Sequence, residues 1–430
     1  MPGIAVASLV HGLDGLFLPP SLEVFALARH GTPEHAWAAE VMGERCLPYR
    51  PHGPWDSAEA LLIGSDIAGV LRRAGVRDLL LTASHTPMVQ AWAEGHDLRL
   101  WTPPLGVAWE LENKLHFHAL CQRVGLPTPA GGPWDRSGDL PGSLPLAVQL
   151  PRGSGGEGTW LLRTPEDALA MRRTRRFIDA RKLLVRELVD GSPCGATVLV
   201  TPTTVALSAV RRQCFEPDRS ARNLLFTGVQ WIPTAALSPT QHEAIESTLL
   251  QLGRALHRRR FLGTANIDFM LTADGPRLLE CNARLSAATP QILRHPETLS
   301  GPDLGQALAA CFVEPAERAT TPELLGLPRS TFEGASYEIV TPASFRRARC
   351  ARIPPNGRYS PDGERYLSAS LAPDGEPDLC LVSLAQPDER IGPEETLATA
   401  LSTRPLYDGD GRPLPIIAQI RDRLSFNFSK

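Results

Sequence analysis

The sequence lacks any long hydrophobic run. No stretch of about 18 uninterrupted apolar residues occurs in its 430 residues, so we expect no membrane-spanning helix. The N-terminal stretch MPGIAVASLVHGLDGLFLPP has no basic lead and is interrupted by Asp14, which favours a buried first strand over a signal peptide. An excess of either charge is also missing, because 44 Lys plus Arg stand against 47 Asp plus Glu. Neither nucleic acid nor a membrane surface is therefore an expected partner.

Several familiar site patterns are missing as well. The eight cysteines, scattered from Cys46 to Cys380, form no CxxC pair, which predicts reduced thiols in a cytoplasmic protein. No GxGxxG opens a Rossmann-type helix with an acidic partner, and no GxxxxGK[ST] occurs, which argues against a dinucleotide site and a Walker-type phosphate loop. No Ser/His/Asp or Cys/His set stands out. The residues alone therefore point to no Ser- or Cys-based nucleophilic mechanism.

The pattern of helices and strands predicts three units. Residues 1–111 alternate helical and strand-like segments, such as a helix over 57–75 and a strand over 76–84, which is typical of a Rossmann-like α/β domain with a parallel sheet. Residues 112–329 carry the candidate site. Residues 330–430 read as a small α+β domain, with a hairpin around Pro373-Asp374-Gly375 and a final helix near 414–424.

The stretch LLECNARLS (278–286) places Glu280, Asn282 and Arg284 at every second position, so these side chains would share one strand face. Leu279 and Cys281 would then share the other. A carboxylate on a partly buried sheet face is costly unless a cation meets it. One interpretation is a structural ion pair between Glu280 and Arg284, and the other is a metal and phosphate site.

The preceding strand bears on this choice. In FMLTADGPRLLE the turn centres near Asp274, so antiparallel pairing sets Asp268 opposite Glu280. Two opposed carboxylates destabilise a ladder unless a cation lies between them, and oxygen ligands from Asp268, Glu280 and Asn282 would suit Mg²⁺. The alternative is an exposed hairpin whose like charges point into water. Cys281 points away from this polar face and is expected to be a buried structural cysteine.

Three further features are weak when each is taken alone. The loop RGSGGEGTW (152–160) follows a strand and would leave backbone N–H groups free to bind phosphate, although a flexible surface hairpin would look similar. Lys114 opens a helix, where a lone lysine is usually solvated. The strand in LLVRELVDG (183–191) would offer backbone groups to an adenine, as many ordinary strands would.

In this order the pieces resemble the ATP-grasp superfamily, over about residues 112–312. They are NK, GLPTP, the glycine loop, RELVDG, GTANIDFML and LLECNAR, followed by SGPDLGQALAACF, which is similar to the biotin carboxylase and carbamoyl phosphate synthetase branch. The resemblance implies an ATP-grasp fold, preceded by the α/β domain and followed by the small α+β domain. It implies Asp268, Glu280 and Asn282 as magnesium ligands and Arg284 as the residue facing the transferred phosphate. The other implied positions are Ser154, Gly155 and Gly156 over the β- and γ-phosphates, Lys114 near the α-phosphate, Glu187 and Val189 at the adenine, and Arg211 and Arg212 near substrate or γ-phosphate.

Two positions depart from the family pattern. Gln149 stands where the family usually has a second phosphate-binding lysine, so a positive charge is missing, although the amide can still hydrogen-bond an oxygen. The segment PCG after Asp190-Gly191 lacks the acidic residue that many members use on the ribose hydroxyls. Arg211 and Arg212 would equally read as solvated arginines.

The resemblance implies a carboxylate–amine ligase that uses ATP and Mg²⁺, with Mn²⁺ as an alternative ion, and makes an amide or peptide bond through an acyl phosphate. The alternatives are a relative that uses bicarbonate or transfers phosphate, and a module that binds ATP without catalysis. The expected partners are a small-molecule carboxylate and an amine, such as amino acids or peptides, and a homodimer is common in this branch. The sequence does not identify the substrates or the pathway.

Overall fold

The computed structural model describes residues 4–9, 14–19, 21–53, 57–136, 139–153, 158–217, 224–313, 317–341, 348–371, 376–383, 390–392, 396–408, 411–423 and 425–428. Its N-terminal unit is a five-stranded parallel sheet in the order β3-β2-β1-β4-β5. The first strand is largely buried, as the apolar N-terminus predicts. The strands are β1 Ile4–Leu9, β2 Leu22–Arg29, β3 Cys46–Tyr49, β4 Asp78–Leu80 and β5 Arg99–Trp101, and the helices are α1 Pro33–Met42, α2 Ala58–Ile63, α3 Ile67–Ala74, α4 Pro87–Gly95 and α5 Leu105–Leu111.

The single helix predicted over 57–75 is wrong, because the structure divides it into α2 and α3. Gly64 ends α2, and its N–H donates to the carbonyl of Ala60. The Ser65 hydroxyl then donates to the Leu62 carbonyl and accepts from the N–H of Ile67. Glycine and serine thus give the backbone a turn to adopt in place of another helical turn.

A small antiparallel sheet follows, in the order β6-β9-β7-β8. One of its faces packs on α7 and α8 through a core that includes Trp134, Val148, Phe177 and Val185. Residues that alternate with this core, among them Arg186, take the opposite face. The strands are β6 Gly131–Trp134, β7 Leu146–Gln149, β8 Thr159–Leu162 and β9 Leu183–Glu187, and the helices are α6 Lys114–Arg123, α7 Pro165–Arg172 and α8 Arg175–Asp179.

The centre of the molecule is a twelve-stranded sheet, whose described path runs β15-β14-β10-β12-β13-β17-β23-β21-β19-β20, with β11 attached to β10 and β16 attached to β11. The long helix α9 (Pro239–Arg258) begins at a Ser238 capping box and buries its apolar stripe against β10, β11 and β15. The strands are β10 Ser192–Val200, β11 Thr204–Leu207, β12 Arg211–Pro217, β13 Leu224–Trp231, β14 Gly263–Thr272, β15 Gly275–Asn282, β16 Glu323–Leu325, β17 Ala335–Val340, β19 Gly357–Tyr359, β20 Tyr366–Ser368, β21 Leu379–Ser383 and β23 Thr396–Ser402.

The remaining elements are α10 Thr289–Arg294, α11 Leu304–Phe312 and α12 Pro415–Arg423, with a separate sheet of β22 Arg390–Ile391, β18 Ala348–Arg352 and β24 Ser425–Phe428. The final helix lies where the sequence predicts it. The C-terminal strands join the large sheet, since β17 pairs with β13 across the predicted boundary at residue 329. The two boundaries between the three predicted domains, after residues 111 and 329, stay predictions.

The predicted hairpin around Pro373-Asp374-Gly375 is wrong in its pairing. The turn itself lies outside the described residues, but the strands on either side of it, β20 and β21, do not pair with each other. Both instead pair with β19, which inserts between them. The turn residues give a local signal, whereas the pairing is decided by a strand that precedes both.

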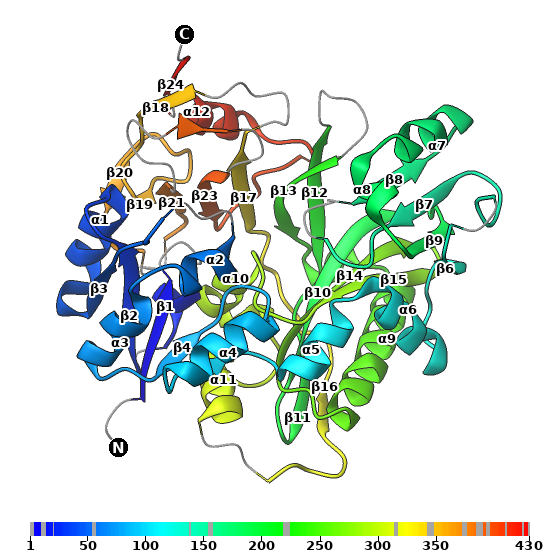
Figure 1. The fold of residues 1–430 in the computed structure, drawn as a ribbon, viewed down its shortest axis with the longest axis horizontal. Helices are drawn as coiled ribbons and strands as arrows, with labels where there is room; N and C mark the ends of the chain where they lie inside the picture. Colours follow the sequence, from blue (N-terminus) through cyan, green and yellow to red (C-terminus); the bar gives the residue numbers. More distant parts are fainter. Residues whose placement is uncertain are drawn as a thin grey trace.

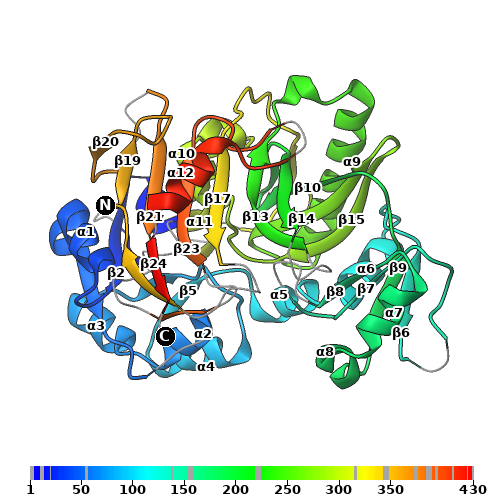
Figure 2. The same ribbon diagram turned by 90° about the horizontal axis from the view of Figure 1, so that it is seen from above.

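The N-terminal unit and the C-terminal strands lie next to each other, away from the small sheet (Figures 1 and 2). Both views place the blue N-terminal unit next to the orange and red C-terminal strands, with α7 and α8 on the opposite side (Figures 1 and 2). Apolar residues of the N-terminal unit and of the C-terminal strands share one core, and the Trp37 indole N–H donates to the Ala369 carbonyl at 2.9 Å. None of the helices among the described residues combines the length and the apolar character that crossing a bilayer requires.

Candidate active site

The β14–β15 hairpin brings two carboxylates together. Asp268 pairs directly with Glu280 across the ladder, as the turn at Asp274 predicts. The Thr272 hydroxyl closes this turn by donating to the Gly275 carbonyl and accepting from the Asp274 N–H. Asp268 is only 7% exposed, so the alternative of like charges pointing into water is wrong for this residue.

The strict alternation predicted for LLECNARLS fails at one residue. The register shifts next to Asp268, so that Phe269 pairs with Leu278 and Leu279 is the extra residue of a bulge. Leu278 is therefore buried and Leu279 only partly so, which reverses the predicted order of the two leucines. Cys281 is buried, as expected of a structural cysteine.

Lys114 meets Glu280 at the first turn of α6. Its ammonium lies 2.5 Å from Glu280 Oε2 and donates to the Gly153 carbonyl at 3.0 Å. The Lys114 backbone N–H donates to the Pro151 carbonyl at 2.8 Å, which ties α6 to the start of the glycine loop. Lys114 is 5% exposed, so the solvated lysine is wrong, and Glu280 pairs with Lys114 in place of the predicted structural partner Arg284.

The pKa values of the two carboxyl groups are shifted in opposite directions. Burial and the facing carboxylate of Glu280 raise the pKa of Asp268 well above its usual range. Burial acts in the same direction on Glu280, but the Lys114 ammonium outweighs it and lowers the pKa of Glu280. These opposite pKa shifts arise at a place where a divalent cation would neutralise both carboxylates.

Two amides complete this oxygen-rich corner. The Asn282 amide nitrogen donates to Asp268 Oδ2 at 3.2 Å, and that of Asn266 lies 3.4 Å from Oδ1. Among the residues that the structure describes, no group of three or more His, Cys, Asp and Glu side chains is arranged to hold a metal. The donor set is thus two carboxylates and carboxamide oxygen, without nitrogen or sulfur ligands, which fits Mg²⁺ better than a transition metal.

Arg284 is held by a residue that the sequence interpretation did not select. Its guanidinium donates to the Glu112 carboxylate, and both side chains are largely buried. Glu112 ends α5 as its C-cap residue and precedes Lys114 by two positions, so one short segment reaches both Arg284 and Glu280. This ion pair holds the guanidinium just beyond the end of β15, where the Arg284 N–H donates to the Asn282 carbonyl at 2.9 Å.

Arg211 is the third cation of the site. It is 2% exposed, its guanidinium donates to the Ser208 hydroxyl at 3.4 Å, and it lies 5.6 Å from the Trp231 ring centroid. Gly195 pairs with both Asp268 and Arg211, and a Cβ there would lie 3.1 Å from the Asp268 carboxylate. The glycine therefore leaves room for the two side chains to approach. Burial lowers the pKa of Arg211 to about 10, although Asp268 opposes this.

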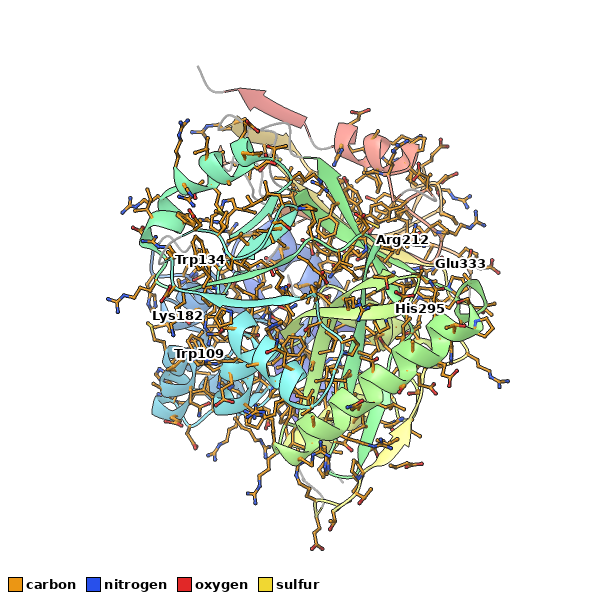
Figure 3. All side chains as sticks on the ribbon, turned by 90° about the vertical axis from the view of Figure 1, so that its right-hand side faces the viewer. Trp109, Trp134, Lys182, Arg212, His295 and Glu333 are labelled. Atoms are coloured by element: carbon orange, nitrogen blue, oxygen red, sulfur yellow. The ribbon has the colours of Figure 1, made fainter. Side chains whose placement is uncertain are left out.

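Arg212 follows Arg211 on β12, so its side chain takes the other face of the strand. It is half-buried and lies on the opposite side of the view from Trp134 in the small sheet (Figure 3). The interpretation of solvated arginines is therefore wrong for Arg211, and the structure separates Arg211 from Arg212.

The small sheet contributes Gln149 and its neighbour Arg186. Gln149 ends β7, and its amide nitrogen donates to the Thr159 hydroxyl at 3.2 Å. Its amide oxygen accepts from the Arg186 guanidinium on β9. Arg186 is 2% exposed and was not selected from the sequence.

Glu187 is the last residue of β9, and Val189 follows two positions later. The Glu187 N–H donates to the Ala130 carbonyl at 2.8 Å, and its carboxylate accepts from the Ala130 N–H at 3.0 Å. Val189 is half-buried in the extended segment that leads from β9 to β10. This segment connects the small sheet to the large one, as a hinge strand would.

The glycine loop itself, with Ser154, Gly155 and Gly156, lies outside the described residues. Its flanks are described: the Leu150 N–H donates to the Gly158 carbonyl at 2.8 Å, closing the β7–β8 hairpin. The Arg152 guanidinium stacks 3.6 Å from the Trp109 ring centroid. The ends of the loop are thus anchored beside Lys114 and Gln149.

A family model described as an ATP-grasp domain matches residues 112–288. This segment is an ATP-grasp domain. The match begins at Glu112 and ends just after Arg284, so it spans the candidate site. No curated protein sequence matches the chain.

Solved structures agree with the fold over nearly the whole chain. The biotin carboxylase domain of 2-oxoglutarate carboxylase from Hydrogenobacter thermophilus is 12% identical, with a TM-score of 0.62 over 99% of this chain and 90% of that one. Phosphoribosylamine–glycine ligase from Thermotoga maritima is 12% identical, with a TM-score of 0.60 over 99% and 98%. L-amino acid ligase from Bacillus licheniformis is 14% identical, with a TM-score of 0.58 over 99% of each chain. At these identities the likeness establishes the fold, which is the ATP-grasp fold predicted from the sequence.

Proposed function

We propose that the chain is an ATP-dependent carboxylate–amine ligase, which forms an amide or peptide bond and releases ADP and phosphate. The observation that carries this proposal is the buried pair of Asp268 and Glu280, bordered by the cations of Lys114 and Arg211, with the ion pair of Arg284 and Glu112 just beyond the end of β15. A polyphosphate with its metal ion needs both signs of charge within one corner.

The proposed roles follow this arrangement. Asp268, Glu280 and Asn282 would hold Mg²⁺, which when bound neutralises charge on the transferred phosphate. Arg284, oriented by Glu112, would face that phosphate and the acyl intermediate, while Arg211 would bind the carboxylate substrate. The remaining proposed contacts are Lys114 and the loop residues Ser154, Gly155 and Gly156 at the phosphates, Glu187 and Val189 at the adenine, and Arg212 near the substrate. Gln149 would lie beside the phosphates, where its amide accepts a hydrogen bond from Arg186.

The reaction proceeds in two displacements. A substrate carboxylate oxygen attacks the γ-phosphorus, the bond to ADP breaks, and an acyl phosphate forms. An amine nitrogen then attacks the acyl carbon, phosphate leaves with the electron pair, and the nitrogen loses a proton. Neither step needs a protein nucleophile, so catalysis rests on positioning and on charge stabilisation by Arg284 and Lys114.

The named structural neighbours support this class and add a second candidate. Two of the three are ligases by name, whereas the biotin carboxylase domain was solved as a dimer with MgADP and bicarbonate. A bicarbonate-using reaction is therefore the alternative, because the same oxygen-rich corner would serve it. A homodimer remains a prediction.

The test is phosphate release from ATP in the presence of Mg²⁺, with amino acids and dipeptides offered in pairs and bicarbonate offered in a separate arm. Active pairs are checked by mass for the loss of one water. Glu280→Gln is the site variant, and Glu243→Gln, an exposed glutamate on α9, is its matched control.

A ligase requires two substrates, loses turnover in E280Q and keeps it in E243Q. Phosphate release that needs bicarbonate and no amine would replace the ligase with the second candidate. Tight ATP binding without turnover on any pair would favour the non-catalytic module. Equal turnover in wild type and E280Q would overturn the proposed metal site.

A further inference from the structure

Arg186 carries a buried positive charge between the two sheets. One terminal nitrogen of its guanidinium donates to the Leu279 carbonyl at 3.1 Å and lies 3.5 Å from that of Leu278, both on β15. The other donates to the Gln149 amide oxygen on β7. The group thus bridges the small sheet and the strand that bears Glu280.

These partners are all neutral. Among the described residues no carboxylate forms an ion pair with Arg186, and its Nε has no hydrogen-bond partner. Burial lowers the pKa of Arg186 to about 10, and the more distant charge of Glu280 opposes this. A cation that is buried among carbonyl and amide oxygens is poorly compensated, and a neutral side chain would join the two sheets at lower cost. The site therefore favours an anion that is not part of the protein.

The location of the Arg186 side chain indicates which anion would bind it. Arg186 alternates with Val185, which lies in the Trp134 core, so its side chain takes the face of the sheet opposite that core. Gln149 is the last residue of β7, directly before the segment that leads into the glycine loop. Arg186 also contributes to the electrostatic environment of Glu280. It thus lies between the base of the glycine loop and the proposed metal corner.

Gln149 has little capacity left for a ligand. Its oxygen accepts from Arg186, and its nitrogen donates to the Thr159 hydroxyl at 3.2 Å. Both ends of the amide are engaged within the protein, so Gln149 orients Arg186 and is not itself the phosphate contact. This changes the role that the sequence analysis gives Gln149.

We infer that Arg186 binds the phosphate groups of the nucleotide and supplies the positive charge that Gln149 does not, with Gln149 as its positioning residue. The inference rests on the proposed function, because it assumes that the ligand is ATP. An arginine suits this place, since it keeps its charge when buried and donates from several nitrogens at once.

The test compares ATP and adenosine binding by calorimetry, because only ATP carries the phosphates. The variants are Arg186→Gln, Arg186→Lys and the double variant Gln149→Lys/Arg186→Gln, which moves the positive charge from β9 to β7. Arg163→Gln, an exposed arginine that follows β8, is the matched control. Urea denaturation of each variant separates loss of folding from loss of binding.

We expect R186Q to weaken ATP binding at least tenfold and to leave adenosine binding within twofold of wild type. R186K and Q149K/R186Q should recover most of the ATP affinity, and R163Q should match wild type. Should R186Q not fold, Arg186→Met carries the same comparison, because it also removes the charge.

Unchanged ATP binding in R186Q would overturn the inference and leave Arg186 as a strut between the sheets. An equal loss of ATP and adenosine binding would also overturn it, because the defect would then be one of shape. Wild-type protein that binds neither ligand would instead reject the nucleotide site of the proposed function, so the two failures are distinguishable.

Discussion

The ammonium of Lys114 lies 2.5 Å from Glu280 Oε2 and also reaches the Gly153 carbonyl at the start of the glycine loop. One cation therefore connects a proposed metal ligand with the loop proposed to cover the phosphates. A divalent ion arriving at Glu280 must share the carboxylate with this ammonium or displace it.

Lys114→Met should consequently change two affinities in opposite directions. Without nucleotide, Mn²⁺ should bind about threefold to tenfold more tightly, because no ammonium competes for Glu280. ATP should bind about tenfold more weakly, because a charge-assisted contact to phosphate is lost. Calorimetry with Mn²⁺ and with ATP measures both. Lys182→Met removes an exposed lysine (Figure 3) and should change neither, and weaker Mn²⁺ binding in K114M would contradict the competition.

The pair of Glu112 and Arg284 leads to a kinetic prediction. Glu112→Gln keeps the shape but removes the charge that orients the guanidinium, so we expect kcat to fall about tenfold and the KM for ATP to stay within about twofold. Arg284→Met should lower kcat by at least about a hundredfold. Steady-state phosphate release measures both. Glu110→Gln serves as the control. Glu110 lies two residues before Glu112 and forms a more exposed ion pair with Arg259, which this substitution breaks. A rise in KM with unchanged kcat would move Arg284 from the reacting groups to substrate binding.

The strand face of the site was predictable because its determinants are local. Strand periodicity and the turn at Asp274 are enough to place Asp268 opposite Glu280. The bulge at Leu279 could not be predicted, because an inserted residue leaves the hydrophobic pattern of the sequence almost unchanged. The overall ATP-grasp fold was likewise predictable, but from the order of several motifs and not from any single one.

The partners of the charged groups were not predictable, because they come from distant segments. Lys114 and Glu112 reach β15 across about 170 residues of chain, and only the packing of α5 and α6 brings them there. Arg186 reads in sequence as one residue of an ordinary strand. The wrong C-terminal hairpin has the same origin, since β19 precedes both strands that it separates.

A buried charge cluster supports the next prediction, which concerns stability. The Asp378 carboxylate is fully buried and binds Arg294 of α10 at 2.9 Å and Arg358 of β19 at 2.7 Å. Asp378→Ala should lower the free energy of unfolding by about 3–5 kcal/mol, because two buried guanidinium groups lose their carboxylate. Urea denaturation measures it. Asp97→Asn, in a highly exposed pair with Arg77, should cost less than about 1 kcal/mol. Equal effects of the two substitutions would mean that water compensates the buried arginines.

Glu34 makes stability depend on pH. It lies on α1, is 7% exposed, and its Oε1 has no hydrogen-bond partner among the described residues. Burial raises the pKa of Glu34 to about 7, although Arg29 opposes this. Between the pKa of the unfolded chain, 4.5, and this value, the folded protein keeps a proton that the unfolded chain has lost. Stability therefore falls as pH rises through this window, by roughly 3 kcal/mol in total.

Glu34→Gln removes this titration and should remove that part of the pH dependence. The free energy of unfolding is measured by urea denaturation between about pH 4 and pH 8, and the wild type should lose stability relative to E34Q as pH rises. The exposed Glu44→Gln serves as the control and should run parallel to wild type. Parallel curves for wild type and E34Q would show that the pKa of Glu34 is the same in the folded and the unfolded chain, because Arg29 offsets the effect of burial.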